Sequence, residues 1–179
     1  MDYVTDTGRR TDEIAALFET TFTASEGREE GALIGELVRN LLETTPDDDI
    51  HVFTASENGA LAGAAIFTRL TYPQDARTVF ILSPMAVATA RQGEGIGQAL
   101  IGHALSALRE RGVDVAMTYG DPAFYGKVGF EPVSEDRARA PLPLSQPIGW
   151  IGQSLSGGPL TPLKGPGTCV AALNDPALW

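Results

Sequence analysis

The chain has little of the two residue types that most often carry metal and thiol chemistry. Its single cysteine, Cys169, permits no internal disulfide, which fits a reducing compartment such as the cytoplasm. Two histidines, His51 and His103, are too few for a zinc site beside one cysteine. Cys169 stands in an apolar segment without an identifiable base, so we interpret it as a small hydrophobic residue. We expect no metal centre and no covalent cysteine mechanism.

Long apolar runs and basic residues are scarce as well. No stretch of about 18 apolar residues occurs, so the sequence predicts no membrane span. Residues Met1 to Asp6 lack the basic and apolar regions of a secretory signal, and we expect a cytoplasmic protein. The 13 basic residues against 23 acidic ones give a net charge of −10, which disfavours a nucleic-acid partner and would attract a cationic amine. The sequence leaves the oligomeric state open, a homodimer included.

What is present is enough apolar sequence for a core. The 179 residues are 43% hydrophobic, which suits a single domain over residues 1–179. Thr11 is a plausible N-cap for a first helix, and a second is expected from about Glu29 to Glu43. Their apolar faces are predicted from helical spacing: Ile14, Leu17, Phe18 and Phe22, then Leu33, Leu37, Leu41 and Leu42. Strands are predicted at 50–55, 61–70 and 78–88, with a hairpin turn at Asn58-Gly59. The chain therefore begins as two helices and an antiparallel meander.

A glycine-rich turn follows the third strand. Gly93, Gly95 and Gly97 precede a helix predicted from about Gly95 to Arg111, which Gly112 would end. A strand at 113–119 would then lie parallel to the strand before the turn. The unpaired N–H groups and the dipole at such a helix start attract anions, and glycine lets phosphate oxygens approach the backbone. The segment from Met85 to Leu108 thus predicts a pyrophosphate site.

Two common phosphate loops fit this turn less well. A Walker A loop needs Gly-Lys-Ser/Thr, and no lysine follows these glycines. A dinucleotide fingerprint would require Gly or Ala where Gln98 stands, although Asp114 lies at roughly the spacing of a ribose-binding acid. That fingerprint also expects an all-parallel sheet, whereas these strands are hairpin-linked. Asp114 is alternatively the polar start of a strand, and a nicotinamide-dependent oxidoreductase stays as an alternative.

The turn resembles a different signature more closely. The residues Gln92-x-x-Gly95-x-Gly97, between an apolar strand and a helix, resemble the Gln/Arg-x-x-Gly-x-Gly/Ala motif of the GNAT superfamily of N-acetyltransferases. The resemblance implies acetyl-coenzyme A as cosubstrate, with pantetheine against the strand edge and the pyrophosphate in the turn. Arg91 would add positive charge near the phosphates. The cofactor-binding residues it implies are Met85, Val87, Gln92, Gly93, Gly95, Ile96, Gly97 and Gln98.

A second segment strengthens this resemblance. Residues 120–131 resemble the family's second signature, Phe-Tyr followed shortly by Gly-Phe. Their sequence, Gly-Asp-Pro-Ala-Phe-Tyr-Gly-Lys-Val-Gly-Phe-Glu, is similar to that of the YhbS-like branch. The implied fold is α/β with a mixed α+β sheet: a meander, then a βαβ acetyl-CoA-binding unit. By resemblance Tyr125 is the general acid that protonates the leaving thiolate, which suits a phenol with a pKa near 10. Asp121 is expected to cap a short helix ahead of Pro122, and Phe124 and Phe130 to be core.

The sequence gives fewer clues to the residues that would bind and deprotonate the acceptor. The attacking amine must be neutral and so needs a base; the candidates are Glu26, Glu29, Glu30 and Asp75, each more often a solvated charge. A strand amide such as that of Val87 would hold the oxyanion. In the Pro/Gly-rich tail, residues 148–155 and 168–173 are expected to be strands. Trp150 and Trp179 are expected to anchor the tail, or Trp150 to line an acceptor pocket.

These observations favour an acetyl-CoA-dependent N-acyltransferase that moves acetyl to an amine of a small molecule or peptide by direct attack on the thioester. The alternative is a catalytically silent acyl-CoA-binding sensor or partner module. The acceptor stays open among polyamines, amino sugars, amino acids and protein N-termini. The tail segment 132–166 has no assigned role.

Overall fold

The computed structural model describes residues 1–8 and 10–179. Its helices are α1 (Thr11–Glu26), α2 (Arg28–Thr44), α3 (Ile96–Glu110) and α4 (Pro122–Tyr125). Its strands are β1 (Asp2–Thr5), β2 (Ile50–Glu57), β3 (Ala60–Leu70), β4 (Val79–Val87), β5 (Val115–Tyr119), β6 (Glu131–Pro132) and β7 (Trp150–Ser154). The strand order is β1-β2-β3-β4-β5-β7-β6 in a mixed sheet, which confirms the predicted fold class.

The chain divides into two compact units. Unit 1 comprises Met1–Phe67 and Pro84–Ala104, and unit 2 comprises Thr68–Ser83 and Leu105–Trp179. The chain crosses from one unit to the other inside β3, β4 and α3, so neither unit is a continuous segment. This division does not test the single domain predicted for residues 1–179, which stays a prediction.

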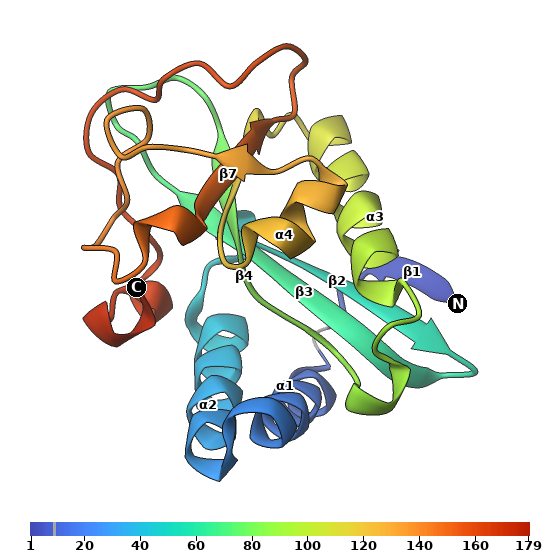
Figure 1. Cartoon of the computed structure of the whole chain (residues 1–179). Coiled ribbons are helices and arrows are strands. Elements are labelled where there is room, and N and C mark those ends of the chain that lie inside the picture. Colours follow the sequence, from blue (N-terminus) through green and yellow to red (C-terminus); the bar gives the residue numbers. More distant parts are fainter. Residues whose placement is uncertain (9) are drawn as a thin grey trace. The chain divides into compact units, whose positions relative to one another are not determined.

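In unit 1 the two N-terminal helices pack side by side (Figure 1). Gly31 permits the close approach, because a Cβ there would lie 1.9 Å from Thr23 Oγ1. The predicted cap of α1 is wrong by one residue: the helix already begins at Thr11, and Arg10 precedes it without a side-chain capping bond. Leu33 is also not core, with 59% exposure. In that turn of α2 the buried apolar side chain is that of the next residue, Ile34.

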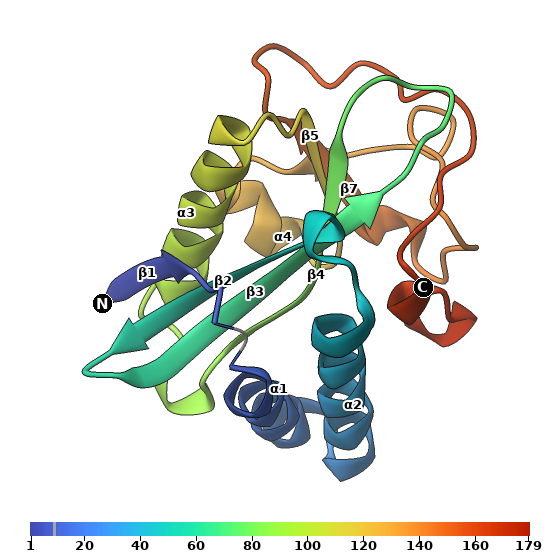
Figure 2. The same ribbon diagram turned by 180° about the vertical axis from the view of Figure 1, so that it is seen from behind.

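The strands of unit 1 form a hairpin with an edge strand. β1 pairs antiparallel with β2, as Figure 2 shows. The turn from β2 to β3 uses positive φ at Asn58 (52°) and Gly59 (82°), which confirms the predicted hairpin turn. Phe53 and Phe67 meet edge to face at 5.8 Å in the buried interior. Burial of each such ring contributes about 1.5–3 kcal/mol, so the hairpin is held from its core side.

Unit 2 contains the parallel pair. β4 pairs with β5 in parallel from Val79↔Val115 to Leu82↔Thr118, and β5 pairs antiparallel with β7. Asp114 stands just before β5, where its carboxylate accepts the N–H of Thr78 at 2.8 Å. Asp114 therefore joins the starts of two strands, the ordinary structural role, and gives no support to a ribose-binding role.

The tail departs from one prediction. Residues 168–173 are not a strand: Thr168 makes an isolated bridge to Thr71, and Ala171–Leu173 turn into a 3-10 helix. An apolar run of that length does not by itself distinguish a strand from a packed turn. Trp150 is 1% exposed and donates from Nε1 to Ala138 O at 2.8 Å, while its ring lies 6.1 Å from that of Trp179. Both tryptophans are thus packing anchors, and Trp150 does not line an acceptor pocket.

Candidate functional site

The strand before the glycine turn is held to it by a side chain. In unit 1, Met85 and Val87 are half-buried near the end of β4, with Ala86 buried between them. Gln92 donates from Nε2 to the carbonyl of Val87 at 3.1 Å. The Gln92 side chain thus ties the turn back to the strand end, a positioning contact that the motif alone did not specify.

The turn itself has the backbone that an anion site requires. Gly93 (φ 83°) and Gly95 (φ 80°) adopt the left-handed conformation, and a Cβ at either position would meet nothing within 4 Å. Glycine is therefore demanded here by conformation and not by crowding. α3 begins at Ile96, and its first helical bond runs from Ala99 N–H to Gly95 O at 3.1 Å. The N–H groups of residues 96–98 precede that bond, so they and the helix dipole face the turn with positive charge.

Arg91 is not the free cation that the sequence suggested. Its Nη1 lies 3.0 Å from Glu57 Oε2, and its Nη2 lies 2.9 Å from Glu94 Oε2. The Glu94 partnership raises the pKa of Arg91 and lowers that of Glu94. One guanidinium against two carboxylates leaves a formal charge of −1 in this triad, so the turn relies on backbone groups for anion attraction.

Tyr125 is placed in unit 2 by a well-defined local structure. Asp121 caps α4 by accepting the N–H of Ala123 at 2.9 Å, with Pro122 in the first turn, as predicted. The Tyr125 ring lies 5.0 Å from Phe124 and 5.8 Å from Phe130, both edge to face.

The residue before the cap, Gly120, makes room for that ring. A Cβ at Gly120 would lie 2.7 Å from Cε2 of Tyr125. The motif's first glycine is therefore a packing requirement of its tyrosine. Sequence reasoning missed this link, although the glycine stood in the quoted motif.

The phenol of Tyr125 is a weaker acid than an exposed tyrosine. Burial raises its pKa to about 12, and a hydrogen bond with Thr118 opposes part of that rise. Thr118 is itself buried and donates to Leu82 O at 2.8 Å. The group stays protonated at neutral pH and can donate a proton or a hydrogen bond. It is, however, a weaker acid than a thiol with a pKa near 8.5.

The base candidates differ in their surroundings. Asp75 is excluded as a proton acceptor by its contacts: its side chain is 5% exposed and lies 2.8 Å from Arg77 Nη2. The Arg77 guanidinium holds the pKa of Asp75 well below its usual range, so this carboxylate does not take a proton at neutral pH. Glu26, Glu29 and Glu30 are exposed around the α1–α2 junction, and their role as base stays a prediction.

Within residues 1–8 and 10–179, no three His, Cys, Asp or Glu side chains group closely enough to hold a metal ion. The helices of those residues include none long and apolar enough to cross a membrane. His103 is half-buried, with its ring 6.1 Å from that of Phe53.

Comparison with known proteins agrees with this geometry. Residues 48–132, from before β2 through β6, match a family model described as an acetyltransferase (GNAT) domain. A relative from Escherichia coli K12, named an uncharacterized N-acetyltransferase, YjhQ, is 33% identical over 131 residues, 70% of this chain and 72% of its own length. The chain belongs to the GNAT acetyltransferase family. The GNAT resemblance of the two signatures is thereby confirmed.

Other GNAT proteins share the sequence in part and the fold throughout. YhbS of Escherichia coli K12, also named an uncharacterized N-acetyltransferase, is 38% identical over 50 residues, which are 28% of this chain and 30% of YhbS. The crystal structure of Escherichia coli YhbS with CoA superposes with a TM-score of 0.77 at 22% identity, covering 97% of this chain and 92% of that one. A Brucella melitensis GNAT acetyltransferase solved with acetyl-CoA gives 0.73 at 22% identity, with 97% of each chain covered. At that identity the likeness shows the GNAT fold.

Proposed function

We propose that this GNAT family member transfers an acetyl group from acetyl-coenzyme A to the amine of a small molecule or peptide. The observation that carries the proposal is the turn at the start of α3. Its two left-handed glycines and the N–H groups of residues 96–98 form an anion-attracting backbone without a lysine. The two fold neighbours crystallised with CoA and acetyl-CoA support this choice of donor.

The donor would lie along the strand end and the turn. The backbones of Met85 and Val87 would pair with the pantetheine arm, and the amides from Gly93 to Gln98 would hold the pyrophosphate. Gln92 supports this arrangement by fixing the strand end to the turn. The N–H of Val87 would stabilise the oxyanion that forms when the amine attacks the thioester carbonyl.

In the reaction the amine nitrogen bonds to the carbonyl carbon, the carbon–sulfur bond breaks, and the sulfur takes up a proton. Tyr125 is the proposed donor of that proton. With a pKa of about 12 the phenol stays protonated throughout the working pH range, so it can hydrogen-bond the sulfur and share its proton as the carbon–sulfur bond breaks, although complete transfer to a thiolate is uphill. The proton lost by the amine passes to a base among the exposed carboxylates or to water. Replacing Tyr125 by Phe should reduce turnover and leave acetyl-CoA binding in place.

A second candidate is the silent acyl-CoA-binding module. The contacts of Asp75 favour it, since the most enclosed of the four base candidates is committed to Arg77. Release of free CoA with an amine panel separates the two, because a module binds acetyl-CoA without turnover. Thermal shifts test the donor: stabilisation by acetyl-CoA and not by NAD is expected, and the reverse would contradict the proposal in favour of an oxidoreductase.

The setting of the enzyme is also a proposal. The lone cysteine favours a reducing compartment, and we place the reaction in the cytoplasm. The net charge of −10 favours a cationic acceptor over an anionic one. A single domain and a homodimer remain parts of this proposal, to be tested by limited proteolysis and by light scattering.

A further inference from the structure

The Pro/Gly-rich tail, which the donor site does not use, forms a pocket within unit 2. Its volume is about 470 Å³, and Glu135, Asp136, Arg139, Leu163 and Gly165 line it. That volume falls in the range of small-molecule sites. The pocket is made of chain without helix or strand, so its shape depends on what holds that chain.

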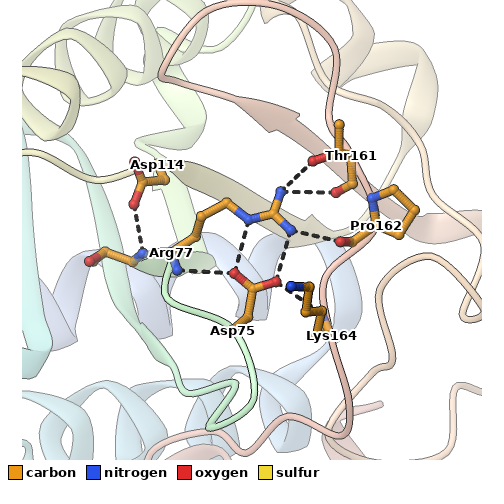
Figure 3. A network of polar contacts seen from close by, with 7 residues as sticks. Asp75, Arg77, Asp114, Thr161, Pro162 and Lys164 are labelled. Atoms are coloured by element: carbon orange, nitrogen blue, oxygen red, sulfur yellow. Dashed lines mark hydrogen bonds and ion pairs between the residues drawn. The ribbon is translucent and has the colours of Figure 1, made fainter.

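One wall of the pocket is held by a partly buried ion pair between Asp75 and Arg77 (Figure 3). Arg77 donates to the carbonyl of Thr161 at 3.0 Å and to that of Pro162 at 2.7 Å. Asp75 accepts the backbone N–H of Lys164 at 3.0 Å. The pair therefore fixes the chain on both sides of Leu163, the residue that faces the pocket.

The opposite wall is fixed through its backbone. Tyr72 donates its hydroxyl to the carbonyl of Arg139 at 2.7 Å, and the indole of Trp150 donates to that of Ala138 at 2.8 Å. The two walls are joined directly, because Leu163 N–H donates to Arg137 O at 2.7 Å. The pocket is thus formed before any ligand arrives, which lowers the entropic cost of binding.

The side chains on these walls carry opposite charges. Arg139 contributes a guanidinium, and Glu135 and Asp136 contribute carboxylates, all exposed. Within the described residues, the side chains of Glu135 and Arg139 have no hydrogen-bond or ion-pair partner. The Asp136 carboxylate already accepts a hydrogen bond from Ser134, which helps to lower its pKa. The backbone is therefore constrained while the charges of Glu135 and Arg139 have no partner, an arrangement that suits recognition better than stability.

We propose that this pocket binds a small molecule that carries both an ammonium and a carboxylate. The carboxylate pairs with Arg139, and the ammonium pairs with Glu135 and Asp136. A free amino acid and a short peptide share this chemistry. This binding does not rest on the proposed function.

Calorimetry with the full chain tests the binding. The probes are alanine and trialanine, against propionate, which lacks the amine, and ethylamine, which lacks the carboxylate. We expect a zwitterion to bind up to about fivefold more tightly than either singly charged probe, as for exposed charge pairs. The tighter of alanine and trialanine identifies the source as amino acid or peptide. Equal affinity for all four probes would overturn the proposal.

Variants locate the site. Arg139→Gln should weaken zwitterion binding about fivefold and leave ethylamine binding unchanged. Glu135→Gln should also weaken zwitterion binding about fivefold, but it should leave propionate binding unchanged. Lys127→Gln, an exposed charge change outside the pocket, is the matched control. Equal affinity in Arg139→Gln and Lys127→Gln would refute the assignment.

Acetyl transfer then separates this inference from the proposed function. If CoA is released with amines but zwitterions bind no better in the wild type than in Arg139→Gln, the pocket assignment fails alone. If zwitterions bind and Arg139→Gln weakens that binding about fivefold, yet no amine releases CoA, the pocket stands and the proposed function fails. Zwitterion binding that Arg139→Gln weakens, together with CoA release by an amine, supports both.

Discussion

Asp75→Asn should destabilise the protein strongly for an exchange that preserves side-chain size. The Asp75 carboxylate is 5% exposed and accepts from Arg77 Nε, Nη2 and N and from Lys164 N, at 2.8–3.0 Å. Removing one partner of a buried pair costs about 3–5 kcal/mol. Arg77 is 25% exposed and keeps its bonds to Thr161 and Pro162, so we expect no more than the lower end, about 3 kcal/mol. For a chain of this length that corresponds to a Tm lower by about 6–12 °C.

The pH dependence of that loss has a definite sign. Arg77 lowers the pKa of folded Asp75 below its unfolded value, so the unfolded chain binds the proton first as the pH falls. The stabilisation is fully present above pH ~4, the unfolded value, and declines below it. Thermal unfolding followed by circular dichroism from pH 3 to 7 should show a constant gap between wild type and variant above pH ~4.5. The gap should narrow at lower pH.

A matched exposed pair provides the control. Asp12 pairs with Arg39 across α1 and α2, with side chains 92% and 43% exposed. Asp12→Asn should leave the Tm nearly unchanged, because exposed pairs are solvated and screened. A Tm loss in Asp75→Asn no larger than in Asp12→Asn would refute the argument that burial gives the Asp75 pair its weight. So would a gap that widens in acid.

Three further predictions concern the candidate site. Tyr125→Phe should lower kcat about 100-fold and leave the Kd for acetyl-CoA unchanged. Wild-type activity should show no loss from Tyr125 ionisation below pH ~11. An unchanged kcat in the variant would show that Tyr125 is not the general acid. Glu94→Gln should tighten acetyl-CoA binding severalfold at low salt, because it removes a carboxylate that pairs with Arg91 beside the turn. The effect should fade toward 1 M salt. Weaker binding would show instead that the turn needs Glu94. Gly95→Ala should cost about 1–2 kcal/mol of stability, because φ at Gly95 is 80°, and it should weaken acetyl-CoA binding. Gly102→Ala, in the middle of α3, should reduce neither stability nor binding. Equal behaviour of the two variants would contradict the role given to the backbone of the turn.

The backbone geometry of the glycine turn was predictable from the sequence because it is local, while its binding residues stay a prediction. The strand, Gly93, Gly95 and the helix start are consecutive, and their geometry follows from backbone rules that a short motif records. The same holds for Asp121, whose cap bond spans two residues. The predicted glycine turn, the Asp121 cap and the Asn58-Gly59 hairpin turn agree with the structure, whereas the N-cap predicted at Thr11 is wrong by one residue.

Charge pairing could not be read in the same way. Arg91 looked like a phosphate-binding cation, but Glu57, 34 positions away in β2, reaches it across the hairpin. Asp75 looked like a solvated acid, yet its surroundings include Lys164, 89 positions further on. Whether a carboxylate is a base, a cap or half of an ion pair is decided by such distant partners. The acceptor chemistry depends on groups of this kind, which is why the sequence names a donor and leaves the acceptor open.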